Sequence, residues 1–155
     1  MKTEGAMSKK YNYSCNIAST LDIIGDRWTL LIIRDLFRGK RKFNELKQSL
    51  VGIAPNILSE RLQHLEQAGI IHSTLYSKHP PRFEYVLTEK GNELRPVLAA
   101  IAIWGSRHLE QRYSKIIHQA CGEEVSMTFY CPHCDSHTDD VRTIMLDEEH
   151  EDHEV

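Results

Sequence analysis

Short hydrogen-bonding side chains line one side of the segment GIAPNILSERLQHLEQAGII at residues 52–71. Pro55 suits the first turn of a helix and Gly69 suits its end, so we predict a single helix here. Leucines at i, i+4 and i+7 give this helix one apolar stripe, formed by Leu58, Leu62 and Leu65. The opposite face is polar but nearly free of lysine, and it carries Asn56, Ser59, Glu60, Gln63 and Gln67. Because such side chains hydrogen-bond to base edges in the major groove, the segment is a candidate recognition helix. An ordinary surface helix is the alternative.

A second group of reactive side chains lies near the C-terminal end, in two pairs with the same internal spacing. The pairs are His118 with Cys121 and Cys131 with Cys134, separated by nine residues. A two-residue gap lets both donors of a pair reach one ion, and tetrahedral Zn²⁺ takes four nitrogen or sulfur ligands. The spacing predicts a structural zinc in a ribbon-like segment over residues 118–142. His137 and His133 are alternatives to His118 as the fourth ligand, and free thiols are the alternative to zinc.

Charge is segregated along the 155 residues, so the net charge of −3 conceals a basic body. Residues 1–117 hold 18 basic and 11 acidic side chains, whereas residues 118–155 hold one basic and 11 acidic. A basic globular body favours a polyanionic partner, with plain solvated surface as the alternative. No signal peptide or membrane span is visible, and four cysteines are too few for a secreted disulfide scaffold, so we expect a soluble cytoplasmic protein.

The elements that must position the polar face follow from periodicity. Apolar spacing predicts helices over residues 16–24, 27–38 and 43–50 ahead of the candidate recognition helix. Residues 70–76 and 83–87 read as two strands joined by a turn at 77–82, where two prolines exclude regular structure, and a long helix follows from about 89 to 113. This order predicts an α+β, mostly α, winged helix-turn-helix with a C-terminal zinc-ribbon-like tail.

Basic side chains flank the predicted recognition helix in this arrangement. Lys40, Arg41 and Lys42 precede the helix that crosses the DNA backbone, and Lys78 and Arg82 lie in the hairpin loop. Such cations supply affinity through phosphates rather than sequence reading. The predicted DNA-contacting residues are therefore Lys40, Arg41, Lys42, Pro55, Asn56, Ser59, Glu60, Arg61, Gln63, Lys78 and Arg82. Arg61 lies on the flank of its helix, where it could instead hold an acid of the same domain, and His64 is expected to be an ordinary surface histidine.

The motifs and their order resemble a known family over residues 15–108. They include CNIASTLDIIGDRW, then KFNEL, LSERLQHLEQAG and PPRFEYVLTEKG, and finally IWGSRH. These are similar to the HxlR-type branch of the MarR-like bacterial transcription regulators. The resemblance implies a homodimer that binds a pseudo-palindromic DNA operator, with the first and last helices building the dimer interface. Ala54 departs from the family, which often has Ser or Thr before the proline; the lost helix cap costs about 1 kcal/mol.

Cys15 stands just before the first predicted helix, where the positive end of the helix dipole favours a thiolate. The resemblance implies a sensor of oxidants or electrophiles, because family members often use a cysteine at this position. The alternative is a small apolar residue packed at the dimer interface.

These observations predict four parts of the chain and one leading function. The parts are a flexible N-terminus at 1–13, a DNA-binding and dimerisation domain at 14–117, the zinc-ribbon-like segment at 118–142 and an acidic disordered tail at 143–155. The expected function is sequence-specific transcription regulation that responds to a redox, electrophile or small-molecule signal. A winged-helix protein-interaction module is the alternative. An enzyme is not expected, because no Gly-rich phosphate loop, nucleophile motif or paired-carboxylate pocket is visible.

Overall fold

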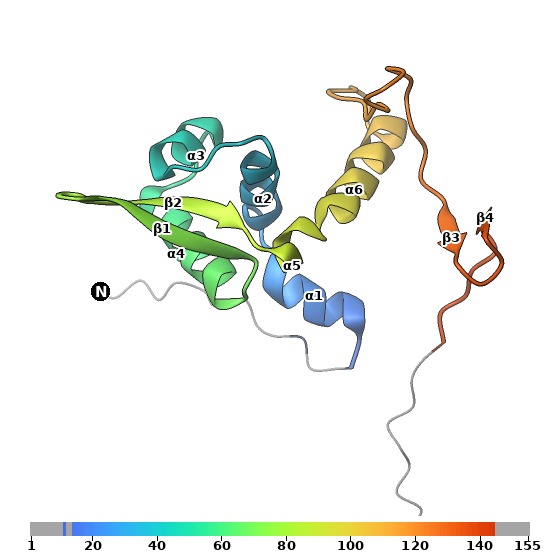
Figure 1. Ribbon diagram of the computed structural model, residues 1–155, viewed down its shortest axis with the longest axis horizontal. Coiled ribbons are helices and arrows are strands. Elements are labelled where there is room, and N and C mark those ends of the chain that lie inside the picture. Colours follow the sequence, from blue (N-terminus) through green and yellow to red (C-terminus); the bar gives the residue numbers. More distant parts are fainter. Residues whose placement is uncertain (1–10, 12–13, 145–155) are drawn as a thin grey trace, which may run out of the picture. The chain divides into compact units, whose positions relative to one another are not determined.

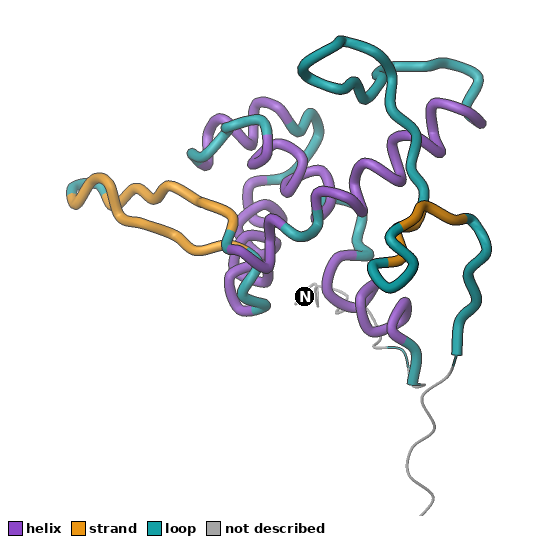
Figure 2. The backbone as a smooth tube through the Cα atoms, turned by 45° about the vertical axis from the view of Figure 1, so that its right-hand side comes forward, coloured by secondary structure: helices purple, strands orange, loops and turns teal. Residues whose placement is uncertain are grey.

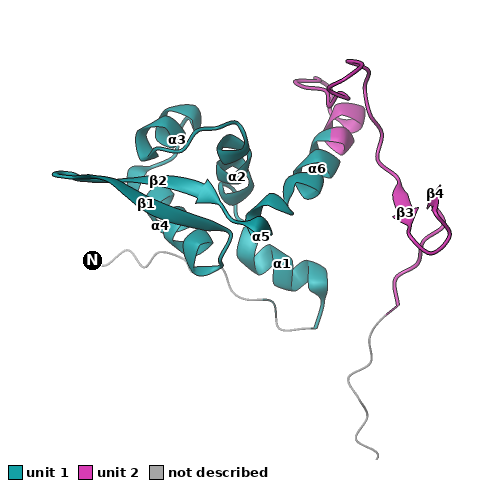
Figure 3. Ribbon diagram, in the orientation of Figure 1, with its two compact units in different colours: residues 1–102 teal, residues 103–155 magenta. Residues whose placement is uncertain are grey.

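The computed structural model describes residue 11 and residues 14–144, which form two compact units (Figures 1 and 3). One unit extends to Ala102 and the other begins at Ile103. The predicted flexible N-terminus and acidic tail fall almost wholly outside the described residues. In the part of the chain that the structure describes, no helix combines the length and apolar character that a membrane span needs.

The first unit contains four helices followed by a β-hairpin, as the sequence predicts. The helices are α1 (Asn16–Ile24), α2 (Thr29–Phe37), α3 (Phe43–Ser49) and α4 (Pro55–Gln67). The hairpin pairs β1 (Ile71–Lys78) with β2 (Pro81–Leu87) in antiparallel register, and Figure 2 shows it extending away from the helices. This order is a winged helix-turn-helix.

The core of this unit is aliphatic and includes the stripe predicted on α4. Leu58, Leu62 and Leu65 are buried, together with Ile32 and Ile33 of α2 and with Leu46 of α3. Since these positions follow a helical period, burying them leaves the remaining α4 face in contact with solvent.

The hairpin is longer and its turn shorter than predicted. Lys78 pairs with Pro81, so only His79 and Pro80 lie between the strands. The prediction that two prolines exclude regular structure was wrong for Pro81, because a proline is tolerated as the first residue of an edge strand.

The helix predicted over residues 89–113 is also corrected. It consists of a short α5 (Glu89–Asn92), capped by the Thr88 hydroxyl, and α6 (Arg95–His108). Pro96 has no N–H to donate to the preceding turn, which accounts for a break at this point. At Gly91 an added Cβ would lie 2.1 Å from the carbonyl oxygen of Ile70, so α5 approaches the end of α4 too closely for any other residue.

Beyond α6, the second unit contains two small turns stabilised by backbone pairing. Ile117 and Glu124 form an isolated β-bridge, and β3 (Phe129–Cys131) pairs with β4 (Ser136–Thr138). Each turn carries one of the two predicted ligand pairs.

Candidate nucleic-acid interface

The polar face of α4 is exposed and largely free of intramolecular bonds. Asn56, Ser59 and Gln63 are exposed, and their side chains make no hydrogen bond to another described residue. Together with Glu60 they occupy positions i, i+3, i+4 and i+7, which is one side of a helix. Their donors and acceptors are therefore available to an external partner. The helix starts without a side-chain cap at Ala54, as predicted, and Pro55 occupies its first turn.

Arg61 contacts acids of its own domain. Its Nη2 donates to Glu60 Oε1 at 2.9 Å and its Nη1 lies 3.7 Å from Asp26 Oδ2. Asp26 also accepts from the backbone N–H groups of Trp28 and Thr29, so it joins the start of α2 to α4. This is the alternative that the sequence left open for Arg61. His64 is a satisfied side chain, since its Nε2 lies 3.0 Å from the carbonyl oxygen of Ile23.

A hollow of about 610 Å³, which we call the wing hollow, brings together predicted residues from three places in the sequence. Lys42 comes from the start of α3, Ser59 from α4 and Arg82 from the hairpin. The other lining residues are Phe43, Asn44, Glu45, Tyr76, Pro81, Phe83 and Tyr85. Sequence reasoning missed the aromatic members, because their positions depend on how the hairpin packs against α3.

The charge of Lys42 in this hollow is already paired within the domain. Its Nζ lies 3.8 Å from Glu84 Oε1 and 5.1 Å from the centroid of the Tyr76 ring. An exposed ion pair of this kind is weak, so a phosphate can replace it at low cost. Arg82 and Lys78 have no ion pair within the described residues, and Lys78 lies at the outer end of the hairpin.

The loop that precedes α3 is held in place by the Glu45 side chain, which caps the start of this helix. The Glu45 carboxylate accepts from the backbone N–H groups of Arg41 and Lys42 at 2.9 and 3.0 Å. The bond to Lys42 and then the bond to Arg41 lower the pKa of Glu45, because both favour its charged form. The Glu45 cap therefore fixes the backbone from which Arg41 and Lys42 extend.

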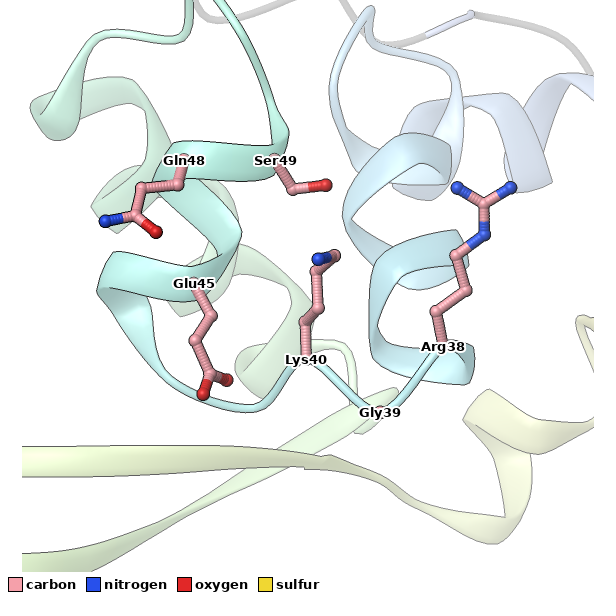
Figure 4. Close-up of a pocket in the computed structure, with 6 residues that line it drawn as sticks. All are labelled: Arg38, Gly39, Lys40, Glu45, Gln48 and Ser49. Carbon is pink, nitrogen blue, oxygen red and sulfur yellow. The ribbon is translucent and has the colours of Figure 1, made fainter.

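A second hollow, of about 380 Å³, lies where α2 ends and α3 passes (Figure 4). Lys40 points into the space between the two helices, and the Ser49 hydroxyl lies across from it. Arg38, Gly39, Glu45 and Gln48 complete the lining. Sequence reasoning missed Arg38, although it opens the run RGKRK to which the predicted cations belong.

The two predicted ligand pairs each form a local turn but do not meet. His118 Nδ1 lies 3.1 Å from Cys121 Sγ, and Gly122 follows with φ +75°. Cys131 and Cys134 lie in the second turn, and Asp135 follows with φ 49°. Within residues 11 and 14–144, no group of three or more His, Cys, Asp or Glu side chains is close enough to hold a metal ion.

The alternative ligands are placed differently, and the thiols have local partners. The His137 ring lies against the Tyr130 ring in a tilted arrangement with 5.4 Å between ring centroids, and His133 Nδ1 lies 3.8 Å from Cys134 Sγ. The pKa of the Cys131 thiol is lowered, first by the backbone N–H of Cys134 and then by that of His133. Backbone N–H groups stabilise a thiolate here in the same way that they would stabilise a thiolate ligand.

Cys15 forms the N-cap of α1 in extended conformation, and it is a half-buried free thiol. Two apolar side chains of α1 are exposed beside it: Ile17 is 71 % exposed and Leu21 is 42 % exposed. The thiol therefore lies beside an apolar face that the described residues leave exposed.

Known proteins share this arrangement. Residues 23–113 match the family described as HxlR-like helix-turn-helix. The uncharacterized HTH-type transcriptional regulator Mb3122 of Mycobacterium bovis is 37 % identical over 122 residues, which cover 77 % of each chain. The crystal structure of PA1607, assigned as a transcription factor, has a TM-score of 0.73 at 31 % identity and covers 88 % of this chain and 97 % of its own. The redox regulator HypR in its oxidised form has a TM-score of 0.57 at 34 % identity, covering 63 % of this chain and all of its own. The chain belongs to the HxlR-like helix-turn-helix family of transcriptional regulators.

Proposed function

We propose that this protein regulates transcription in the cytoplasm by binding a specific DNA site, with α4 as the recognition helix. The observation that carries the proposal is the polar face of α4. Its Asn56, Ser59 and Gln63 side chains are exposed and have no partner among the described residues, beside a hollow lined by Lys42 and Arg82. An α-helix fits the major groove, where Gln pairs with adenine and Glu accepts from cytosine. The cations of the loop before α3 and of the hairpin supply the phosphate contacts.

The test is binding of the full chain to DNA taken from upstream of its own gene. Fluorescence anisotropy is measured at several salt concentrations, with a scrambled duplex of equal length as control. A DNA reader prefers one site and loses affinity steeply with salt. Binding that is weak, equal for both duplexes and insensitive to salt would favour the protein-interaction alternative.

We further propose that the regulator acts as a homodimer on a pseudo-palindromic operator. Val97, Ile101 and Trp104 lie at i, i+4 and i+7 of α6 and are 40 %, 50 % and 61 % exposed. No residue of α6 is fully buried in the single chain. An apolar stripe on one helix face is typical of a surface that a second subunit covers. Two copies of α4 would then address half-sites about one DNA turn apart.

The signal we propose is oxidation or covalent modification of Cys15. The thiol is half-buried next to the exposed apolar residues of α1, so added charge or bulk would disturb a dimer contact there. The similarity to HypR, a redox regulator, supports this class of signal.

Finally, we propose that the two ligand pairs of the second unit converge on one structural zinc ion. Each pair lies in a turn that ends with a residue at positive φ, and each turn is held by backbone pairing. The second unit has no buried apolar residue among those described, so it lacks a core of its own. Units this small usually need a metal or disulfides, and the four donors match the zinc set.

A further inference from the structure

The tip of the β1–β2 hairpin carries two exposed prolines between two cations. Pro80 and Pro81 are both exposed, and Lys78 and Arg82 stand on either side of them. Neither cation forms an ion pair within the part of the chain that the structure describes. Residues 77–82 also contain no acidic side chain. The tip therefore presents an apolar surface framed by positive charge.

Pro81 weakens the hairpin locally. It pairs with Lys78 in the first pair after the turn, and a proline has no N–H to donate there. A proline can protect a strand edge from pairing with another chain, but Lys78 and Arg82 already supply charges that do so. A residue that breaks a local rule without a local gain indicates a function.

The tip is stiff and lies on the side of the domain that carries the recognition helix. The Ser77 hydroxyl donates to the carbonyl oxygen of Pro80 at 3.1 Å, and each proline ring fixes its own φ. Pro81 and Arg82 line the wing hollow together with Ser59 of α4. Figures 1 and 2 show the hairpin projecting beyond the helices of the first unit. DNA that receives α4 therefore lies within reach of the tip.

The length and width of the hairpin determine how it can meet DNA. Glu84 of β2 bridges to Lys42 in the loop before α3. From Glu84 to Pro80 an extended strand covers about 13 Å, at about 3.3 Å per residue. The minor groove, which adjoins the major groove that α4 would occupy, is about 7.5 Å deep and about 6 Å wide. The tip is long enough to reach the bases, but two strands about 4.8 Å apart with their side chains exceed this width, so the groove must open.

An apolar wedge between base pairs unstacks them, opens the minor groove and kinks the duplex. We propose that the Pro80–Pro81 tip inserts between two base pairs and kinks the operator, while Lys78 and Arg82 contact the phosphates on either side. This inference rests on the proposed function and extends it. Pyrimidine–purine steps such as TA and CA kink most easily, so the tip selects sequence through DNA deformability at base pairs that α4 does not touch.

The wild-type full chain gives the first test, on duplexes from upstream of its own gene. Energy transfer between dyes at the two duplex ends measures the bend, and 2-aminopurine in place of single adenines reports unstacking. Saturating protein should bend the duplex by at least about 20° and raise 2-aminopurine fluorescence at a step beside the α4 contact. Specific binding with a bend below this range overturns the inference and leaves the proposed function intact. If the wild type binds no DNA at any salt concentration, both fail.

Variants then separate the wedge from the charge beside it. Pro81→Ala removes the ring and restores a backbone N–H, so the hairpin is preserved. It should reduce affinity several-fold, reduce the bend by about half or more and abolish the 2-aminopurine signal. Pro81→Leu should restore the bend, because it replaces one apolar wedge with another. Arg82→Ala is the matched comparison: its affinity should fall, but the bend at saturation should remain. An unchanged bend in Pro81→Ala, or an equal loss of bend in Arg82→Ala, overturns the wedge.

The last arm tests selection by deformability. The step at which 2-aminopurine brightens is replaced by AA, which is stiff. Wild-type affinity should fall several-fold, whereas the affinity of Pro81→Ala should not depend on this replacement. Equal dependence in the two proteins overturns the claim that the tip selects sequence.

Discussion

Arg61 on α4 lies 3.7 Å from the Asp26 carboxylate at the start of α2, and this pair orients the candidate recognition helix from within its own domain. Both side chains are less than a quarter exposed, at 22 % and 23 %. Under the proposed function, Arg61 therefore contributes by positioning α4.

We predict that Arg61→Ala lowers the free energy of unfolding by about 1 kcal/mol, at the upper end for a partly exposed pair. Urea denaturation measures the effect, and a double-mutant cycle with Asp26→Asn isolates the pairwise term. Full additivity of the two variants would contradict a direct interaction.

We predict that Gln63→Ala reduces discrimination at particular base pairs by about 1–3 kcal/mol and leaves nonspecific binding intact. The Gln63 amide is exposed and has no partner among the described residues, so nothing in the domain depends on it. Gln67→Ala is the matched control, because Gln67 lies in the last turn of the same helix. Anisotropy with single-base operator variants measures the difference. An unchanged operator preference would mean that Gln63 does not read bases.

Arg82→Ala should behave differently from Gln63→Ala. Losing a phosphate contact weakens binding to all sequences and reduces the slope of log affinity against log salt by about one. A loss confined to one DNA sequence would instead assign Arg82 to base reading.

Some features were predictable because they depend on neighbours in the sequence. The leucine stripe of α4 follows from the helical spacing of its apolar residues. The hairpin follows from two segments with strand-like composition on either side of a turn. The break between α5 and α6 also has a local cause, since Pro96 lacks the N–H that a continuous helix would need. The strong apolar period across residues 94–104 nevertheless favoured one continuous helix.

Other features depend on residues that are distant in sequence. Arg61 pairs with Asp26 only because α4 packs against the start of α2. Tyr85 lines the wing hollow because its strand, β2, hydrogen-bonds to the loop at Arg41. No spacing rule links such residues, so neither contact could be predicted from the sequence.

We predict that the wild-type protein is a dimer at micromolar concentration and that Ile101→Glu makes it monomeric. A charge in the centre of the exposed α6 stripe would be buried without a partner in a dimer, at a cost of several kcal/mol. Sedimentation equilibrium measures the change, and Arg107→Glu on the same helix is the control. A monomeric wild type would contradict both the dimer and the palindromic operator.

We predict that Cys15→Ser retains DNA binding in reducing buffer and loses its response to oxidant. Serine keeps the size and the N-cap character of the residue but cannot be oxidised like a thiol. DNA affinity is measured before and after treatment with diamide, with Cys134→Ser as the comparison. Equal oxidant sensitivity in the wild type and Cys15→Ser would assign the response to the thiols of the second unit.

We predict about one zinc ion per chain in protein purified without added zinc. The two turns hold His118 with Cys121 and Cys131 with Cys134, and bringing them together would cross-link a unit without a buried core. Because metal binding to such a unit is also its folding energy, modification of the thiols should release the ion. Cys131→Ser should lose zinc and speed proteolysis after about residue 120, while thermal unfolding of the winged helix stays unchanged. Cys15→Ser should retain the metal, since that thiol belongs to the first unit. A stoichiometry near zero, with all three thiols of the second unit freely reactive in the native protein, would rule out the zinc site.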